Sequence, residues 1–179
     1  MGIRSSNTAE IAFEDVRVPQ ENLIGKEGAG FYQLMHFFEV TRVMVAGQAI
    51  GLSQACLDES IKYSKERTAF GAPIGSFQAT MTKLTEMAVR IEALRNLVYK
   101  AAWSLDEGKP DYHLAAIAKY YGGQTAVFCA NAAVEIHGGY GYIDEYKVQK
   151  LYRDAKILEL YEGTKEAEIM TIGRTLLSR

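Results

Sequence analysis

The chain has 179 residues, a length that suits one domain with a substantial core. Its hydrophobic fraction of 48% and charged fraction of 23% are those of an ordinary soluble globular protein, and they exclude a disordered or membrane-embedded chain. The formal net charge is −2 and the basic residues are scattered, which argues against nucleic acid or a membrane as the main partner.

The two cysteines, Cys56 and Cys129, each lie in an apolar helical pattern and form no CxxC pair. This pattern favours buried free thiols in a reducing compartment over a disulfide, and we expect no metal site. The sequence contains neither an apolar stretch of membrane-spanning length nor the apolar core of a signal peptide. We therefore expect a cytoplasmic location, or the mitochondrial matrix in a eukaryote.

The first part of the chain predicts a single extended strand. Residues Thr8–Val18 read TAEIAFEDVRV, with apolar side chains at Ile11, Phe13 and Val16, and Pro19 closes the segment. A lone strand leaves its backbone donors and acceptors unpaired, so natural domains seldom begin this way. We therefore expect residues 1–25 to be the remnant of a β-domain with its linker, and the chain to be a fragment of a longer protein.

From Gly30 onward almost every segment predicts helix, so the predicted fold class is all-α. Apolar residues spaced by three and four mark two long helices that precede the turn Asp106–Asp111 and a third that follows it. The predicted stripes are Phe31, Leu34, Phe38, Val45, Ala49 and Leu52; then Phe77, Met81, Leu84, Ala88, Ile91, Leu94, Val98, Ala101 and Leu105; then Leu114, Ile117, Tyr121, Phe128 and Ala132. A short helix around Val148–Ile157 and a terminal helix around Lys165–Leu177 complete an antiparallel four-helix bundle over residues 26–179.

Three segments depart from the pattern of a plain bundle. The first is Glu66–Gln78, whose glycines and proline predict a loop between the first two long helices. In a functional interpretation, Arg67 binds a phosphate, Phe70 stacks on a ring and Gln78 forms hydrogen bonds to the polar edge of a ligand. Arg67 at a helix end is also favourable to the helix dipole without any ligand.

The second segment is His137–Tyr142, which carries three glycines in four residues. Gly138 fits a helix C-cap, and glycines in such number also let a backbone approach a ligand closely. The third is LYEGT at Leu160–Thr164. Glu162 fits either a solvated glutamate at a helix start or a carboxylate that points into a cleft, and the residues alone leave both interpretations open.

Taken together, RTAFG with Gln78, HGGYGYIDEY and RDAKILELYEGT resemble the acyl-CoA dehydrogenase family in its C-terminal helical domain. The resemblance extends over essentially the whole chain, and its first 25 residues resemble the end of that family's middle β-domain. It implies a homo-oligomeric flavoprotein, a tetramer or dimer, that uses FAD, acts on an acyl-CoA and passes electrons to an electron-transfer flavoprotein.

The resemblance also implies roles for individual residues. Glu162 falls where the family places the base that removes the α-proton of the thioester, while the β-hydrogen leaves as hydride to the flavin. The positions implied to touch FAD are Arg67, Phe70 and Gln78, then Glu135, Gly138 and Gly139, then Thr164 and Glu166. The positions implied to bind substrate are Glu39, Arg42, Tyr161 and Gly163. A few members place the base in the first helix, but the equivalent residue here is Thr41, which cannot serve as one.

Four positions depart from the family pattern. Glu135, Glu166 and Glu168 stand where glutamine is common, and Ala69 replaces a residue that is often hydroxylated. The alternatives that remain are an acyl-CoA oxidase-like flavoprotein and, for this chain by itself, a non-catalytic helical module for assembly. The length and branching of the acyl group do not follow from this sequence.

Overall fold

The structure is a computed structural model that describes residues 1–178, and most of these residues are helical. The long helices are α1 (Gly30–Glu66), α2 (Gln78–Asp106) and α3 (Tyr112–His137), followed by α4 (Lys147–Ala155) and α5 (Lys165–Leu177). A hairpin of two-residue strands, β1 (Thr68–Ala69) and β2 (Ala72–Pro73), joins α1 to α2. Short 3-10 turns lie at Gln20–Asn22 (η1), Ile74–Ser76 (η2), Gly138–Tyr142 (η3) and Lys156–Glu159 (η4). The predicted all-α bundle is confirmed.

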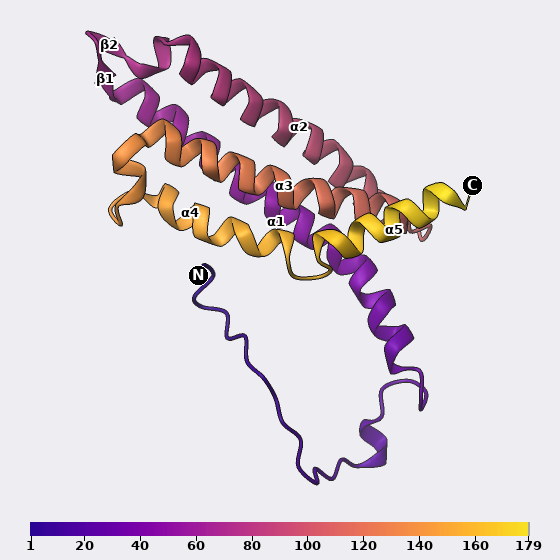
Figure 1. Cartoon of the computed structure of the whole chain (residues 1–179). Helices are drawn as coiled ribbons and strands as arrows, with labels where there is room; N and C mark the ends of the chain where they lie inside the picture. The colour runs from indigo at the N-terminus through magenta and orange to yellow at the C-terminus, as the bar shows by residue number, and fades with distance from the viewer. Residues whose placement is uncertain (179) are drawn as a thin grey trace.

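Helix α3 lies at the centre of the bundle, in contact with α1 and α2 and with the later elements α4, η4 and α5 (Figure 1). Its sequence explains the position, because most of its buried residues are alanine or glycine and let neighbouring helices approach closely. A Cβ placed on Gly122 would lie 3.3 Å from the Cβ of Ala49 on α1. On Gly123 it would lie 2.9 Å from the carbonyl oxygen of Leu158.

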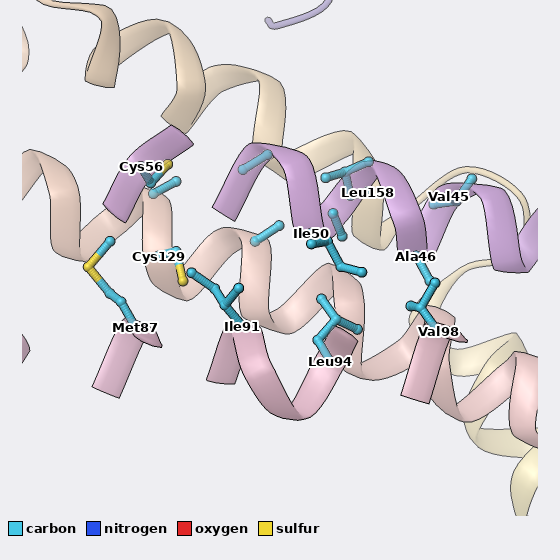
Figure 2. Close-up of a cluster of buried hydrophobic side chains, with 14 of the residues drawn as sticks. Val45, Ala46, Ile50, Cys56, Met87, Ile91, Leu94, Val98, Cys129 and Leu158 are labelled. Atoms are coloured by element: carbon cyan, nitrogen blue, oxygen red, sulfur yellow. The ribbon is translucent and has the colours of Figure 1, made fainter. Parts of the chain in front are cut away.

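The apolar core lies between α1, α2 and α3. Figure 2 shows Met87, Ile91, Leu94 and Val98 of α2 pointing toward α3 and α1, and all four are buried. Cys56 and Cys129 lie in the same core as free thiols, as predicted. Burial raises the pKa of the Cys56 thiol to about 12 and that of Cys129 to about 11, so neither is an accessible thiolate.

Parts of the predicted apolar stripes are wrong. Phe31 and Leu34 are exposed, because the first turns of α1 project beyond the other helices (Figure 1). On α2, Met87 is fully buried in place of the predicted Ala88, which is exposed. The two separate helices predicted after the bundle's third helix are present as α4 and α5, with η4 and the Glu162 segment between them.

The segment Thr8–Val18 forms no strand, so this part of the prediction is wrong. It runs without regular backbone pairing, and Ile11 and Phe13 are more than 70% exposed. A strand needs a neighbouring strand for its backbone groups, and among the described residues only β1 and β2 pair with each other. Between residues 1 and 178, no helix combines the length and apolar character needed to span a bilayer.

Candidate functional site

Glu162 lies in a tight left-handed turn between η4 and α5. Glu162 has φ of 57° and Gly163 has φ of 108°, so two consecutive residues occupy a region that side chains disfavour. The hydroxyl of Thr164 then caps α5 by accepting the amide of Ala167 at 3.3 Å. Strain at a non-glycine residue persists where the surrounding structure determines it, and such positions are concentrated at functional sites.

The turn places the Glu162 side chain in an open groove of about 510 Å³ on α1. Residues of one face of α1 line this groove together with the residues of the turn: Thr41, Met44, Val45, Gln48, Tyr161 and Glu162. The Thr41 hydroxyl donates a hydrogen bond to the Glu162 carboxylate, and the Tyr161 hydroxyl donates to the side-chain oxygen of Gln48. The groove thus combines one oriented carboxylate with apolar walls.

A group of buried charges lies behind the turn. The Nε of Arg42 lies 3.0 Å from a carboxylate oxygen of Glu168, which is fully buried, but the angle between them is not that of a hydrogen bond. Lys119, 1% exposed, donates from its Nζ to the carbonyl oxygen of Gly163. Burial raises the pKa of Glu168, although both cations oppose this, and burial lowers the pKa of Lys119, although Glu168 opposes this.

The sequence prediction missed Lys119 entirely and treated Glu168 only as a replacement of glutamine. One signal was present, since Lys119 is a single charged residue in the otherwise apolar run LAAIAKYYGG of α3. A lysine on the central helix of a bundle is almost never fully buried unless its charge is paired. Glu39 lies apart from this group, with a carboxylate oxygen 3.5 Å from the His36 ring.

Arg67, Gly138 and Gly139 meet in a second open pocket, of about 480 Å³, at the end of the bundle that carries the hairpin. Aromatic and apolar residues complete its wall, namely Tyr63, Ile74, Ile136, His137, Tyr140 and Ile143. The Arg67 guanidinium lies 5.6 Å from the centre of the Tyr140 ring, within the range of a cation–π contact. Both glycine Cα positions face open space, with no atom within 4 Å of an added Cβ.

His137 forms the inner wall of this pocket. Its ring stacks on Tyr63 with ring centres 4.1 Å apart, and its Nδ1 lies 2.8 Å from the carbonyl oxygen of Ala133. That acceptor requires the proton on Nδ1. Burial lowers the pKa of the His137 imidazole, so the neutral ring is favoured.

The remaining residues implied to touch FAD differ in their surroundings. Phe70 is fully exposed at the hairpin tip with φ of 52°, and Gln78 is exposed at the start of α2. Glu135 is paired with Lys83 and accepts from Asn131 at 2.8 Å, and the bond from Lys83 is the largest cause of its lowered pKa. Glu166 is exposed in the first turn of α5, where its charge favours the helix dipole.

The two pockets are far apart. Thr41 in the first and Arg67 in the second are separated by most of α1, about 39 Å at 1.5 Å per residue. The structure therefore brings Arg67 together with Gly138 and Gly139, and Glu162 together with Arg42, Tyr161 and Gly163. It does not bring the two groups together.

Comparison with known proteins gives consistent matches. Residues 28–177 match the family described as acyl-CoA dehydrogenase, C-terminal domain. The chain is 48% identical over 177 residues to the probable acyl-CoA dehydrogenase YngJ of Bacillus subtilis, covering 99% of this chain and 47% of that protein. It is 45% identical to acryloyl-CoA reductase (NADH) of Anaerotignum propionicum, covering 100% of this chain and 45% of that protein.

A solved structure shows the same fold. Butyryl-CoA dehydrogenase from Megasphaera elsdenii aligns with a TM-score of 0.90 at 48% identity, over 92% of this chain and 43% of that one. The chain spans about half the length of the relatives it matches. These matches agree with the motifs around Arg67, Gly139 and Glu162, and the chain therefore belongs to the acyl-CoA dehydrogenase family, in the C-terminal helical domain of that family.

Proposed function

We propose that this chain supplies the catalytic base of a flavin-dependent acyl-CoA dehydrogenase, with Glu162 removing the α-proton of an acyl-CoA thioester. The product is the trans-2-enoyl-CoA. The observation that carries the proposal is the Glu162 carboxylate, which a left-handed turn directs into an open groove and which the Thr41 hydroxyl orients. A carboxylate that is held in position beside a bound substrate can act as its general base.

The residues around Glu162 suit proton abstraction next to a thioester. The Thr41 hydroxyl donates to one oxygen of the Glu162 carboxylate, and this carboxylate lines the groove. As the α-proton moves to Glu162, negative charge develops on the thioester oxygen, and the backbone N–H of Glu162 is a donor suited to it. Bound FAD would supply the acceptor for the β-hydride, while the protein supplies orientation and charge.

The second pocket supports FAD as the cofactor. Arg67 offers a guanidinium for a phosphate, and two glycines without neighbours on one side offer a backbone surface that a nucleotide can approach closely. Phe70, fully exposed at the hairpin tip, suits stacking on a ring outside this chain. Since this pocket lies far from Glu162, we infer that it contacts the flavin nucleotide of a neighbouring subunit in a homo-oligomer.

Not every implied cofactor contact fits its surroundings. The Glu135 carboxylate already has Lys83 and Asn131 as partners, and a second anion beside it would be repelled. The Thr164 hydroxyl is engaged in capping α5, and Glu166 is an exposed carboxylate. We therefore propose Arg67, Phe70, Gln78, Gly138 and Gly139 as the cofactor contacts of this chain and leave the other three out.

For the substrate, we propose Tyr161 and Glu39 as the residues that contact the acyl-CoA. Tyr161 lines the groove beside Glu162, and Glu39 lies on α1 before Thr41. Arg42 and Gly163 face Glu168 instead, so we assign them to supporting the turn. One relative is named as an acryloyl-CoA reductase, and in that direction Glu162 would return the proton to the α-carbon.

The substitution Glu162→Gln tests the proposal in the flavin-loaded enzyme that contains this chain. Glutamine keeps the shape and removes the proton acceptor, so anaerobic bleaching of the flavin by an acyl-CoA should slow by about 10²–10⁴-fold or more. The flavin content should not change, and Glu145→Gln on the exposed surface is the matched control. Bleaching at nearly the wild-type rate in Glu162→Gln would assign proton abstraction to another residue.

Two further measurements separate the alternatives. Rapid reoxidation of the reduced enzyme by oxygen would indicate an oxidase-like protein, whereas electrons passing to an electron-transfer flavoprotein would support a dehydrogenase. Without flavin absorbance in the purified homo-oligomer, the proposed function would fail and an assembly module would be favoured. The isolated chain itself should bind little FAD, because its Arg67 pocket lies far from its own Glu162.

A further inference from the structure

Lys119 is unusual because a nearly fully buried lysine serves a single backbone carbonyl. Its Nζ donates to the oxygen of Gly163, the residue that follows the proposed base. Burying an ammonium group is costly, and lysines are buried where a partner compensates for the lost water. The interaction crosses from the central helix α3 to the turn before α5, so it fixes that turn against the rigid core.

Glu168 packs against the same turn. Its Oε1 would lie 2.2 Å from a Cβ built on Gly163, so only glycine fits between the carboxylate and the backbone. Its side chain is 0% exposed and pairs with Arg42 of α1 at 3.0 Å. The turn that directs Glu162 is therefore enclosed by one buried cation and one buried anion.

The charged groups around Glu162 come from every element packed against it. Arg42 lies on α1, Lys119 on α3 and Glu168 on α5, and the charge of Glu162 acts on both Lys119 and the neighbouring Tyr161. Glu159 of η4 also acts on Lys119, but Lys156 pairs with it at 2.5 Å. Lys165 lines a small cavity with Lys119 but is exposed. Among the buried and half-buried side chains, two cations, Arg42 and Lys119, thus face the carboxylates of Glu168 and Glu162.

We propose that Lys119 and Glu168 are positioning residues for the base, which hold the Glu162–Gly163 turn and balance the charge around the Glu162 carboxylate. This inference rests on the proposed function of Glu162. When Glu162 takes the α-proton, the group changes from balanced to one net positive charge. That charge lies beside the turn that carries the proposed base, so it favours a step in which negative charge develops on the thioester oxygen.

The charge balance can be tested with three variants of the flavin-loaded enzyme. Lys119→Met removes a cation and leaves excess negative charge, so it should move the acidic limb of the pH profile of the bleaching rate to higher pH. Glu168→Gln removes an anion and should move the same limb to lower pH. We expect each shift to be about one pH unit, and the double variant should return close to wild type.

A conservative variant and a second measurement distinguish the effect of the Lys119 charge from its effect on the position of the turn. Lys119→Arg keeps the charge, so its limb should stay at the wild-type pH while its rate falls with the altered geometry. Hydrogen–deuterium exchange of the segment 160–166 should quicken in Lys119→Met, because the turn loses its anchor. Lys147→Met, which removes the exposed partner of Glu59, should leave both the limb and the exchange unchanged.

Opposite shifts that cancel in the double variant support the proposal, since a purely structural role would move both single variants in one direction. The proposal would be overturned if the acidic limb of the bleaching rate lay at the same pH in all variants. It would also be overturned if hydrogen–deuterium exchange of residues 160–166 were unchanged in Lys119→Met. If Lys119→Met does not fold, the other two variants test the proposal. The acidic limb of the bleaching rate should then move to lower pH in Glu168→Gln and stay at the wild-type pH in Lys119→Arg. Glu162→Gln in the same series separates the two claims: bleaching at the wild-type rate there contradicts the proposed function itself.

Discussion

The two pockets of this chain are built in different ways. Around Glu162 the chain supplies the proposed base, its hydrogen-bond partner and the buried charges behind it. Around Arg67 it supplies an open surface, with Gly138 and Gly139, at which an added Cβ would meet no atom within 4 Å, and with the exposed Phe70. In the first pocket the chain itself holds the proposed base in place, whereas the described residues leave the second pocket as an open surface.

The contrast has a physical basis in what each task requires. A base must be held within a fraction of an ångström of its substrate, which calls for packing and fixed hydrogen bonds. A surface that receives a ligand carried by another subunit needs to remain accessible until the two meet. Substitutions should therefore affect chemistry at the first pocket and affinity at the second.

Apart from the loss of the Glu162 carboxylate itself, the largest effect within this comparison should come from Gly163→Ala. The added Cβ would lie 2.2 Å from Oε1 of Glu168, at a φ that alanine disfavours, so the turn must shift. Displacing the base by about 1 Å can cost about 10²-fold in rate. Gly173→Ala on α5 is the matched control, because no atom lies within 4 Å of its added Cβ.

Flavin bleaching rates and urea unfolding of both glycine variants check this prediction. Gly173→Ala should keep the wild-type rate and gain slightly in stability from the helix propensity of alanine. Comparable rates in the two variants would show that Gly163 has no close packing requirement.

A smaller effect is expected from Arg67→Gln in the second pocket. Losing a charge-assisted contact to a phosphate should weaken flavin binding by about 10-fold or more, because such bonds contribute about 1.5–3 kcal/mol. The free energy of unfolding should change by less than about 1 kcal/mol, since only the cation–π contact with Tyr140 is lost. Flavin titration measures the first quantity, with the exposed Arg174→Gln as control. Unchanged flavin affinity would remove Arg67 from the proposed contacts.

The smallest effect concerns pH and the wall of the second pocket. Burial lowers the pKa of His137 below its ordinary value of 6.5, so the unfolded chain takes up a proton first as the pH falls through 6.5. Wild type should therefore lose stability on acidification from about pH 7.5 to about pH 5.5. His137→Phe keeps an aromatic ring stacked on Tyr63 and should lose less stability over the same change in pH. Equal losses, measured by urea unfolding at both pH values, would contradict the assignment.

The helices could be predicted from the sequence because burial on one face repeats every three to four residues. Helix α5 begins at Lys165 and ends at Leu177, as the sequence predicted. The exposed first turns of α1 could not be predicted in this way. The spacing of Phe31 and Leu34 marks an apolar face but does not say which surface covers it.

The candidate site was predictable only in part. Arg67, Gly139 and Glu162 lie in motifs of local sequence, and the resemblance reaches them directly. Lys119 and Glu168 are far apart along the chain, and their relation depends on α3 and α5 packing against the same turn. The spacing of apolar residues does not predict that Lys119 and Glu168 contact the same turn. Nor does a lone glutamate before a glycine predict that both residues are left-handed.

The central claim is that Glu162 alone removes the α-proton, and isotope exchange tests it most directly. An acyl-CoA analogue without a transferable β-hydrogen is incubated with the flavin-loaded enzyme in D₂O, and deuterium at the α-carbon is followed by mass spectrometry. We predict exchange in wild type and in flavin-saturated Arg67→Gln, and a loss of about 10²–10⁴-fold in Glu162→Gln. Exchange at the wild-type rate in Glu162→Gln would contradict the account.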